Sequence, residues 1–190
     1  MAQLGGPSAI GVLALQGGYH AHAKVLNALG HDVCLVRYAH QLPDLAGLVL
    51  PGGESTTMLK VIDRENLGDG LDAFVRSGRP VLATCAGMIL AARSVSDPEQ
   101  KSFGWIDIDV TRMGFGRQLD SFEATSDDGT LPLLFIRAPR IVAVGAGVDV
   151  LARYQSEPIM VKQGAVVAAS FHPELTADST VHHMVFGTPS

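Results

Sequence analysis

The first half of the chain alternates short apolar runs with helical patterns, and this alternation limits the folds open to it. The apolar runs of strand length are residues 9–15, 31–38, 45–51 and 80–84. The helical patterns between and after them are residues 19–30, 54–66, 70–78 and 86–93. Strands that are apolar throughout and separated by helices indicate βαβ units, whose parallel sheet is covered by helices on both faces.

The second half of the chain has a different pattern, with strand-like runs that follow one another closely. These runs are residues 105–113, 133–139, 140–147, 148–155, 157–164 and 165–175. Short loops such as Gln163-Gly164 favour antiparallel hairpins, and residues 176–186 favour a terminal helix. We therefore predict one α/β domain over residues 1–190. It has three layers, with an open, mostly parallel sheet flanked by helices and antiparallel strands in the second half.

Composition excludes several classes of protein. The chain is 47% hydrophobic and 17% charged, which predicts a compact, ordered domain. Its net charge of −5 argues against nucleic-acid binding, and no apolar run is long enough to span a bilayer. Two cysteines form no disulfide framework, and the first residues lack the basic start of a signal peptide. We expect a cytoplasmic protein that binds neither nucleic acid nor membrane.

A lone cysteine, Cys85, lies within the stretch PVLATCAGMIL, where an apolar run ends and a helical pattern begins. In open α/β sheets, ligands bind outside the carboxyl ends of the strands. A nucleophile on a tight strand-to-helix turn is exposed there, and the positive end of the helix favours thiolate over thiol. The alternative is a small buried hydrophobic residue, which is what we expect of Cys34 inside its strand.

The stretch SFHPEL offers a base and an orienting carboxylate for such a nucleophile. Residues i and i+2 of an extended chain project to the same side, and Pro173 favours extended geometry at His172. Glu174 is therefore placed to hold the His172 imidazole in one tautomer and to stabilise its protonated form. Two alternatives remain open, a polar strand end at the surface and a His-x-Glu metal pair.

Further histidines receive no role in this interpretation. His20 and His22 point apart on the predicted helix, so they do not complete a metal site, and we expect both to be solvated. His182 and His183 lie near the C-terminus, and nothing in the pattern distinguishes them. The metal pair therefore has no evident third ligand.

The stretch LVLPGGESTTM places two glycines between a strand and a helix. Gly52 and Gly53 let the backbone turn sharply and bring its N–H groups close to a ligand, which is typical of an oxyanion site. It is no Walker phosphate loop, since the Gly-Lys-Ser/Thr ending is missing. The alternative is an ordinary turn before a helix that Ser55 or Thr56 caps.

Taken together, these motifs resemble the class I, triad-type glutamine amidotransferases, and more narrowly the glutaminase subunits of pyridoxal 5′-phosphate synthases. The matching stretches are GVLALQG, LVLPGGESTTM, TCAGMI, FGRQLDSFE, FIRAP and SFHPELT, in the family's order along nearly the whole chain. The stretches PGGESTTM, GRQ-x-x-SFE and FIRAP are the discriminating ones. Ala21 and Met113 stand where the family usually has an acidic residue and an asparagine.

The resemblance implies a role for each matched residue. Cys85 would be the nucleophile, His172 the general base and acid, and Glu174 the orienting carboxylate. The implied glutamine-binding residues are Gly52, Gly53, Glu54, Ser55, Arg112, Ile136 and Arg137. Without the resemblance, the arginines would be ordinary surface or salt-bridge residues.

The resemblance also implies the reaction and the partners. L-glutamine would be hydrolysed to glutamate and ammonia through a cysteine thioester, with no cofactor and no metal. The ammonia would pass to the synthase (lyase) subunit of pyridoxal 5′-phosphate synthase. Because glycine peptides flip at little steric cost, we further predict that a flip of the Gly52-Gly53 peptide couples hydrolysis to assembly, with Gln16 on the first loop contributing to that coupling. Alternatives are a glutaminase for another acceptor, such as imidazole glycerol phosphate synthase, and a non-catalytic interaction protein.

Overall fold

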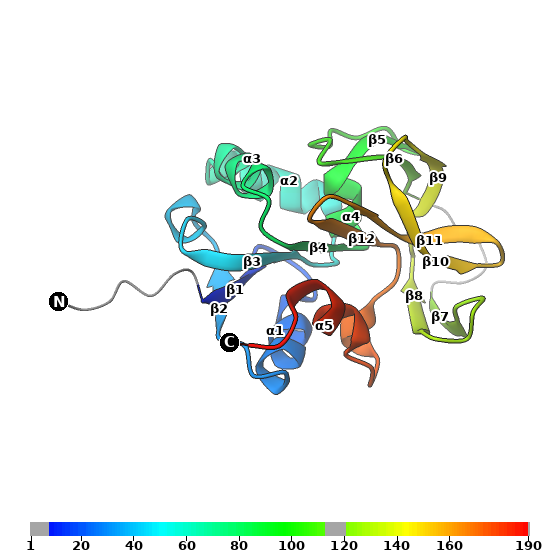
Figure 1. Cartoon of the computed structure of the whole chain (residues 1–190). Helices are drawn as coiled ribbons and strands as arrows, with labels where there is room; N and C mark the ends of the chain where they lie inside the picture. Colours follow the sequence, from blue (N-terminus) through cyan, green and yellow to red (C-terminus); the bar gives the residue numbers. More distant parts are fainter. Residues whose placement is uncertain (1–7, 113–120, 190) are drawn as a thin grey trace.

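The structure is a computed structural model that describes residues 8–112 and 121–189. Its centre is a seven-stranded sheet in the order β10-β11-β12-β4-β3-β1-β2 (Figure 1). The strands are β1 Ala9–Leu13, β2 Val33–Val36, β3 Leu45–Leu50, β4 Val81–Thr84, β10 Asp149–Tyr154, β11 Glu157–Gln163 and β12 Val166–Ala169. The run from β2 to β12 is parallel, whereas β11 and β10 join antiparallel. The predicted mixed sheet is confirmed.

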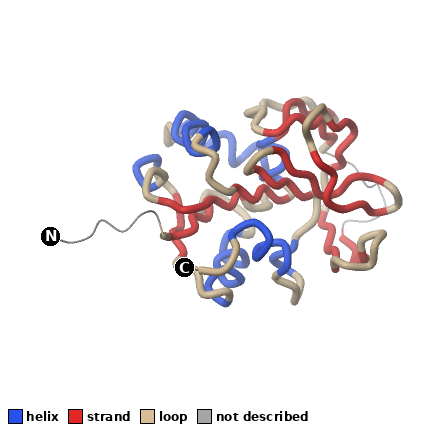
Figure 2. The backbone as a smooth tube through the Cα atoms, in the orientation of Figure 1, coloured by secondary structure: helices blue, strands red, loops and turns tan. Residues whose placement is uncertain are grey.

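Helices cover both faces of this sheet. They are α1 Tyr19–Ala28, α2 Ser55–Arg64, α3 Gly68–Arg76, α4 Ala86–Ala91 and α5 Thr180–Phe186. Helices α2, α3 and α4 lie on one face and α1 and α5 on the other, with the strands between them (Figures 1 and 2). Two short 3₁₀ turns, η1 Ala39–Gln41 and η2 Pro173–Leu175, complete the helical elements of the described residues. None of these helices is long and apolar enough to cross a membrane.

The core is split by the sheet into two apolar clusters. On β3, Leu48 and Leu50 belong to the cluster that includes Met58 of α2. Val49, between them, belongs to the opposite cluster with Leu26 of α1. Successive side chains of a strand point to opposite faces, so a strand that is buried on both faces must be apolar at every position. This is the physical basis of the continuous apolar runs in the sequence.

Two smaller sheets extend the second half of the chain. One joins β5 Ala92–Ser96, β6 Ile106–Thr111 and β9 Arg140–Val144, and the other pairs β7 Ser121–Thr125 with β8 Pro132–Ile136. The prediction of one helix over residues 86–93 was wrong, because α4 ends at Ala91 and β5 begins at once. Arg93 then forms ion pairs with Asp107 and Asp109 of β6. Pairing with a distant strand thus overrides the local helical preference.

One glycine allows α4 to cross the end of β3 closely. A Cβ on Gly87 would lie 2.0 Å from the carbonyl oxygen of Leu50, so no larger residue fits there without a shift of the backbone. The approach brings the loop after β3 beside the start of α4. It therefore places the Gly52-Gly53 turn next to Cys85.

Candidate active site

The loops that follow the parallel strands β1, β3, β4 and β12 meet around a cavity of about 570 Å³. Every residue predicted to be catalytic, glutamine-binding or partner-coupling lines it. They are Gln16, Gly52, Gly53, Glu54, Ser55, Cys85, Arg112, Ile136, Arg137, His172 and Glu174. The carboxyl ends of parallel strands share one edge of the sheet, which is why loops so distant in sequence converge. Sequence reasoning did not single out Gly18, Ile89, Pro98 and Leu175, which also line the cavity.

Cys85 lies at the junction of β4 and α4 with an unusual backbone. Its φ of 47° and ψ of −106° lie in a region that residues with a side chain rarely adopt. The neighbouring strand holds it there, since the Cys85 N–H donates to the carbonyl of Ala169 at 2.8 Å. Its side chain is largely buried but reaches the cavity wall. A strained turn between strand and helix is how α/β hydrolases present a nucleophile.

His172 and Glu174 form a buried pair that lines the same cavity as Cys85. The His172 Nδ1–H donates to Glu174 Oε1 at 2.7 Å, and the residues are 8% and 5% exposed. A Cβ on Gly52 would lie 2.4 Å from His172 Cε1 and 3.4 Å from Cys85 Cβ. The imidazole and the cysteine therefore pack against the same glycine, and the surface alternative for this stretch does not fit.

The charges of this group favour a protonated imidazole. Burial alone would lower the pKa of His172. The Cys85 sulfur and the Glu174 carboxylate outweigh burial and raise the pKa of His172 to about 10. Burial opposes ionisation of Glu174 as well, but the histidines around it hold the pKa of this carboxyl below its usual range. The arrangement thus favours a protonated imidazole held between the Cys85 sulfur and the Glu174 carboxylate.

Two histidines that were expected to be solvated or without a role are buried behind Glu174, and that expectation was wrong. His22 of α1 and His182 of α5 are each 0% exposed. The missed signal is helical spacing, since His22 shares the buried face of α1 with Leu26, four residues on. His20 is exposed, as expected, and His183 is exposed as well.

Glu54 caps helix α2, whereas the alternative interpretation of this turn gave the cap to Ser55 or Thr56. Its carboxylate accepts hydrogen bonds from the backbone N–H groups of Thr56 at 3.2 Å and Thr57 at 2.7 Å. Hydrogen bonds from the Thr56 hydroxyl and from Thr57 lower the pKa of Glu54 to about 2, although burial acts in the opposite direction. Arg112 Nη2 lies 3.2 Å from Glu54 Oε1, so a guanidinium and a carboxylate stand together at the cavity.

The first loop packs directly on the glycine turn. Gln16 Oε1 accepts a 2.6 Å hydrogen bond from the Glu54 N–H, and the Gly18 N–H donates to the Gly52 carbonyl at 3.0 Å. Most of the motif GRQ-x-x-SFE, together with Met113, lies outside the described residues. In the part of the chain that the structure describes, acidic, histidine and cysteine side chains form no cluster suited to a metal ion.

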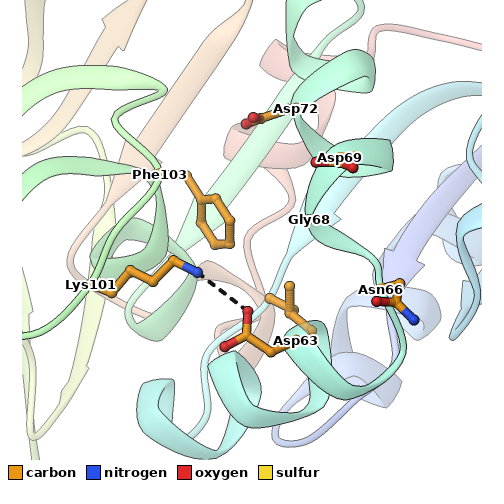
Figure 3. Close-up of a pocket in the computed structure, with 8 residues that line it drawn as sticks. Asp63, Asn66, Gly68, Asp69, Asp72, Lys101 and Phe103 are labelled. Carbon is orange, nitrogen blue, oxygen red and sulfur yellow. Dashed lines mark hydrogen bonds and ion pairs between the residues drawn. The ribbon is translucent and has the colours of Figure 1, made fainter.

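A second cavity, of about 370 Å³, lies between α2, α3 and the loop before β6 (Figure 3). Asp63, Asp69 and Asp72 face it, and Lys101 Nζ lies 3.3 Å from Asp63 Oδ1. None of the residues predicted to act on substrate lines this cavity. The candidate active site is therefore the cavity that contains Cys85.

Known structures share this architecture. A solved structure described as a glutamine amidotransferase superposes with a TM-score of 0.88 at 41% identity, over 93% of this chain and 96% of that chain. The PurLQS structure from Thermotoga maritima, at 16% identity and a TM-score of 0.68, shares the fold alone. Fold and site thus define a class I glutamine amidotransferase.

Sequence comparison narrows the class to a family. The SNO glutamine amidotransferase family matches residues 12–187, and the chain belongs to that family. Its relatives include the pyridoxal 5′-phosphate synthase subunit PdxT of Koribacter versatilis (strain Ellin345), 48% identical over 179 residues and 92% of each chain. The PdxT subunit of Solibacter usitatus (strain Ellin6076) is 46% identical over 185 residues, covering 92% of this chain and 96% of the relative.

Proposed function

We propose that this chain is the glutaminase subunit of a pyridoxal 5′-phosphate synthase and acts in the cytoplasm. It hydrolyses the side-chain amide of L-glutamine and hands the ammonia to a synthase subunit. The observation that carries the proposal is the meeting of Cys85, His172 and Glu174 at one cavity, in a chain whose relatives carry that subunit name. No cofactor enters this chemistry.

The reaction follows from the geometry of these three residues. The Cys85 thiolate attacks the amide carbon of glutamine and forms a tetrahedral intermediate. His172 donates its proton to the leaving nitrogen, so ammonia departs and a thioester remains. His172 then takes a proton from water, whose oxygen attacks the thioester and releases glutamate. Throughout, Glu174 holds the imidazole through Nδ1 and stabilises its positive charge.

Backbone N–H groups supply the oxyanion site in this proposal. The first N–H groups of a helix have no partner within it, so the N–H of Ala86 at the start of α4 is available to the developing oxyanion. The Gly52 carbonyl accepts from Gly18. The N–H of Gly53 points away from Gly18, because the C=O and N–H of a trans peptide lie on opposite sides. This N–H is the second donor.

Charged groups at the cavity suit the amino-acid end of glutamine. The substrate carries an α-carboxylate and an α-ammonium, so it needs a cation and an acceptor away from the thiol. Arg112 is already engaged by Glu54. Arg137 forms no ion pair with any described residue, and it lines the cavity beside Ile136. We therefore assign the α-carboxylate to Arg137, whose guanidinium fits a carboxylate in a fork, and give Arg112 the task of holding the Glu54 loop.

Mass spectrometry after treatment with a glutamine-mimicking electrophile tests the proposal. The expected result is one adduct, located at Cys85 and blocked by excess glutamine. Absence of an adduct on folded protein would favour a non-catalytic interaction protein instead. The acceptor is tested separately, by pyridoxal 5′-phosphate formation from glutamine when the chain is mixed with a pentose phosphate, a triose phosphate and the synthase subunit. Failure there, with an intact glutaminase reaction, would point to another acceptor.

A further inference from the structure

A buried chain of polar side chains continues behind Glu174, away from the cavity. The His22 Nδ1 and His182 Nε2 atoms lie 2.9 Å apart, and His22 Nε2 lies 3.1 Å from Thr84 Oγ1. The same Nε2 atom lies 3.3 Å from Glu174 Oε2. These residues come from α1, α5, β4 and η2, and Figure 1 shows α1 and α5 side by side on one face of the sheet. We call His22 and His182 the histidine pair.

His22 contacts the carboxylate oxygen of Glu174 that His172 does not bind, Oε2. Glu174 Oε1 is bound by His172, but Oε2 is buried and has no hydrogen-bond partner among the residues that the structure describes. An ionised carboxylate with a bare buried oxygen is costly. His22 Nε2 lies 3.3 Å from this oxygen, so the state of that nitrogen decides whether the carboxylate is stabilised or repelled.

The contacts select one tautomer for the histidine pair. With the proton on His22 Nε2, its positive end faces Thr84 and the Glu174 carboxylate, and Nδ1 accepts from the Nε2–H of His182. With the proton on Nδ1, the bare Nε2 lone pair would face the carboxylate. His182 would then carry its own proton on Nδ1, which is buried without a partner. A buried N–H without an acceptor is costly, so the first tautomer is the stable one.

Both histidines of the pair are held neutral. Burial lowers the pKa of His22 to about 4, outweighing the attraction of Glu174, and the positive charge of His172 lowers it further. Burial and His22 lower the pKa of His182 to about 3. The charged or titratable groups facing His22 are thus Glu174 and His172 from the η2 side and His182 from α5. A neutral donor can stabilise Glu174 without cancelling the negative charge that His172 needs.

We propose that His22 is a positioning residue of the glutaminase site. It directs its Nε2–H toward the Thr84 hydroxyl and Glu174 Oε2, and it thereby keeps the carboxylate ionised and aimed at His172. His182 acts through His22, by donating to Nδ1 and so fixing the proton on Nε2. The inference rests on the proposed function for its kinetic consequences, but its structural part concerns only the protonation of His172.

The test compares two replacements of His22 that differ in one donor. The His22→Gln side chain can place an amide N–H near the position of Nε2, whereas His22→Leu fills similar space with no donor. Titration of His172 by NMR on histidine-labelled protein, without glutamine, gives the first measurement; the signal is assigned with His172→Ala. We expect His22→Leu to lower the deprotonation midpoint of His172 by about one pH unit and His22→Gln to change it by less than half of that.

Glutamate release supplies the second measurement. We expect His22→Leu to lower kcat about tenfold with little change in KM, because His22 does not line the cavity. His20→Gln, on the exposed side of the same helix, is the control and should behave as wild type. The double variant His22→Leu/His182→Leu should lose no more than His22→Leu alone, because His182 acts only through His22.

The two measurements separate the inference from the proposed function. An unchanged His172 titration in folded His22→Leu protein would overturn the positioning role, whatever the activity. Equal effects of His22→Leu and His22→Gln on the titration would also overturn it, since the missing donor would then not be the cause. A shifted titration in a chain that hydrolyses no glutamine would leave the positioning role standing and refute the glutaminase.

Discussion

Gln16 Oε1 accepts a 2.6 Å hydrogen bond from the backbone N–H of Glu54, although the two residues are 38 positions apart. The bond ties the loop after β1 to the turn that holds Gly52 and Gly53. A Cβ on Gly17 would lie 2.1 Å from the Gly52 carbonyl oxygen, so the two loops are also in close backbone contact. A displacement of the loop after β1 would therefore also displace the Gly52-Gly53 turn of the proposed oxyanion site.

Partner dependence is the prediction that follows from this contact. Isolated glutaminase would waste glutamine, and the Gly52-Gly53 peptide can flip at small steric cost. Loss of one oxyanion donor costs on the order of 100–1,000-fold in rate. We expect the chain alone to hydrolyse glutamine slowly and the synthase subunit to raise the rate at least tenfold. Gln16→Ala should reduce this activation more than it lowers the free energy of unfolding.

The measurement is glutamate release at saturating glutamine, with and without the synthase subunit. Complex formation is established independently by sedimentation. Equal rates in the two conditions, with the complex present, would rule out the switch. If the synthase subunit activates Gln16→Ala by the same factor as wild type, Gln16 takes no part in the switch.

Replacement of the proposed triad should separate the three roles. Cys85→Ala should abolish glutamine hydrolysis while the fold remains, because one small side chain is lost. Glu174→Gln should cost less than His172→Ala, since an amide can still hold the ring but cannot stabilise its charge. Cys34→Ala is the matched control and should retain wild-type turnover. Hydrolysis at the wild-type rate by Cys85→Ala would refute the nucleophile assignment.

Gly52→Ala should inactivate the site without unfolding the chain. The added Cβ would lie 2.4 Å from His172 Cε1, so the imidazole must move away from Cys85. Gly68→Ala is the control, since its Cβ would meet nothing closer than 3.8 Å. We expect glutamate release to fall by at least 100-fold in Gly52→Ala only, on the order of the penalty for misplaced catalytic groups. Thermal unfolding midpoints show whether the fold is kept.

Alkylation should distinguish the two cysteines. Cys85 lines the cavity beside His172, which can accept the proton of the thiol. Cys34 lies within β2, where the Gln41 side chain contacts its sulfur at 3.6 Å. We expect iodoacetamide to modify Cys85 first between about pH 6 and 8, as followed by peptide mass spectrometry. Faster modification of Cys34 in the native protein would contradict this placement of the thiols.

Acid should destabilise the fold through the histidine pair. In the folded chain, the pKa values of His22 and His182 are lowered to about 4 and about 3. In the unfolded chain both return to the ordinary histidine pKa of 6.5, so below that pH the unfolded chain binds more protons than the folded chain. Their contribution to stability is therefore present above about pH 6.5 and is lost as pH falls toward 4 and then 3. Between pH 7 and pH 5 we expect a loss of roughly 1–2 kcal/mol per histidine.

Urea unfolding at the two pH values measures this effect. The variant His22→Leu/His182→Leu lacks both groups. Between pH 7 and pH 5, the decrease in its free energy of unfolding should therefore be smaller than the decrease in wild type, by on the order of several kcal/mol. Carboxylates other than Glu174 contribute to acid unfolding in both proteins and cancel in the comparison. The same pH dependence in both proteins would exclude the histidine pair as its source.

Local pattern was enough to predict the central layers of this fold. The strands β1, β3 and β4 of the parallel sheet are buried on both faces, so their apolar runs are continuous and stand out in the sequence. The strand-to-helix turn at Cys85 and the i, i+2 spacing of His172 and Glu174 are local features as well, because residues close together in the sequence determine them. The family followed from motifs that span nearly the whole chain, and its prediction is confirmed.

Tertiary contacts decided what local pattern could not. Ala92 leaves the helix because β6 offers backbone partners and acidic side chains for Arg93. His22 and His182 are 160 positions apart, and only the packing of α1 beside α5 brings them together behind Glu174. A sequence states which residues share a helix face. Which distant partner that face meets, and whether a polar side chain there is buried, depends on the packing of the whole chain.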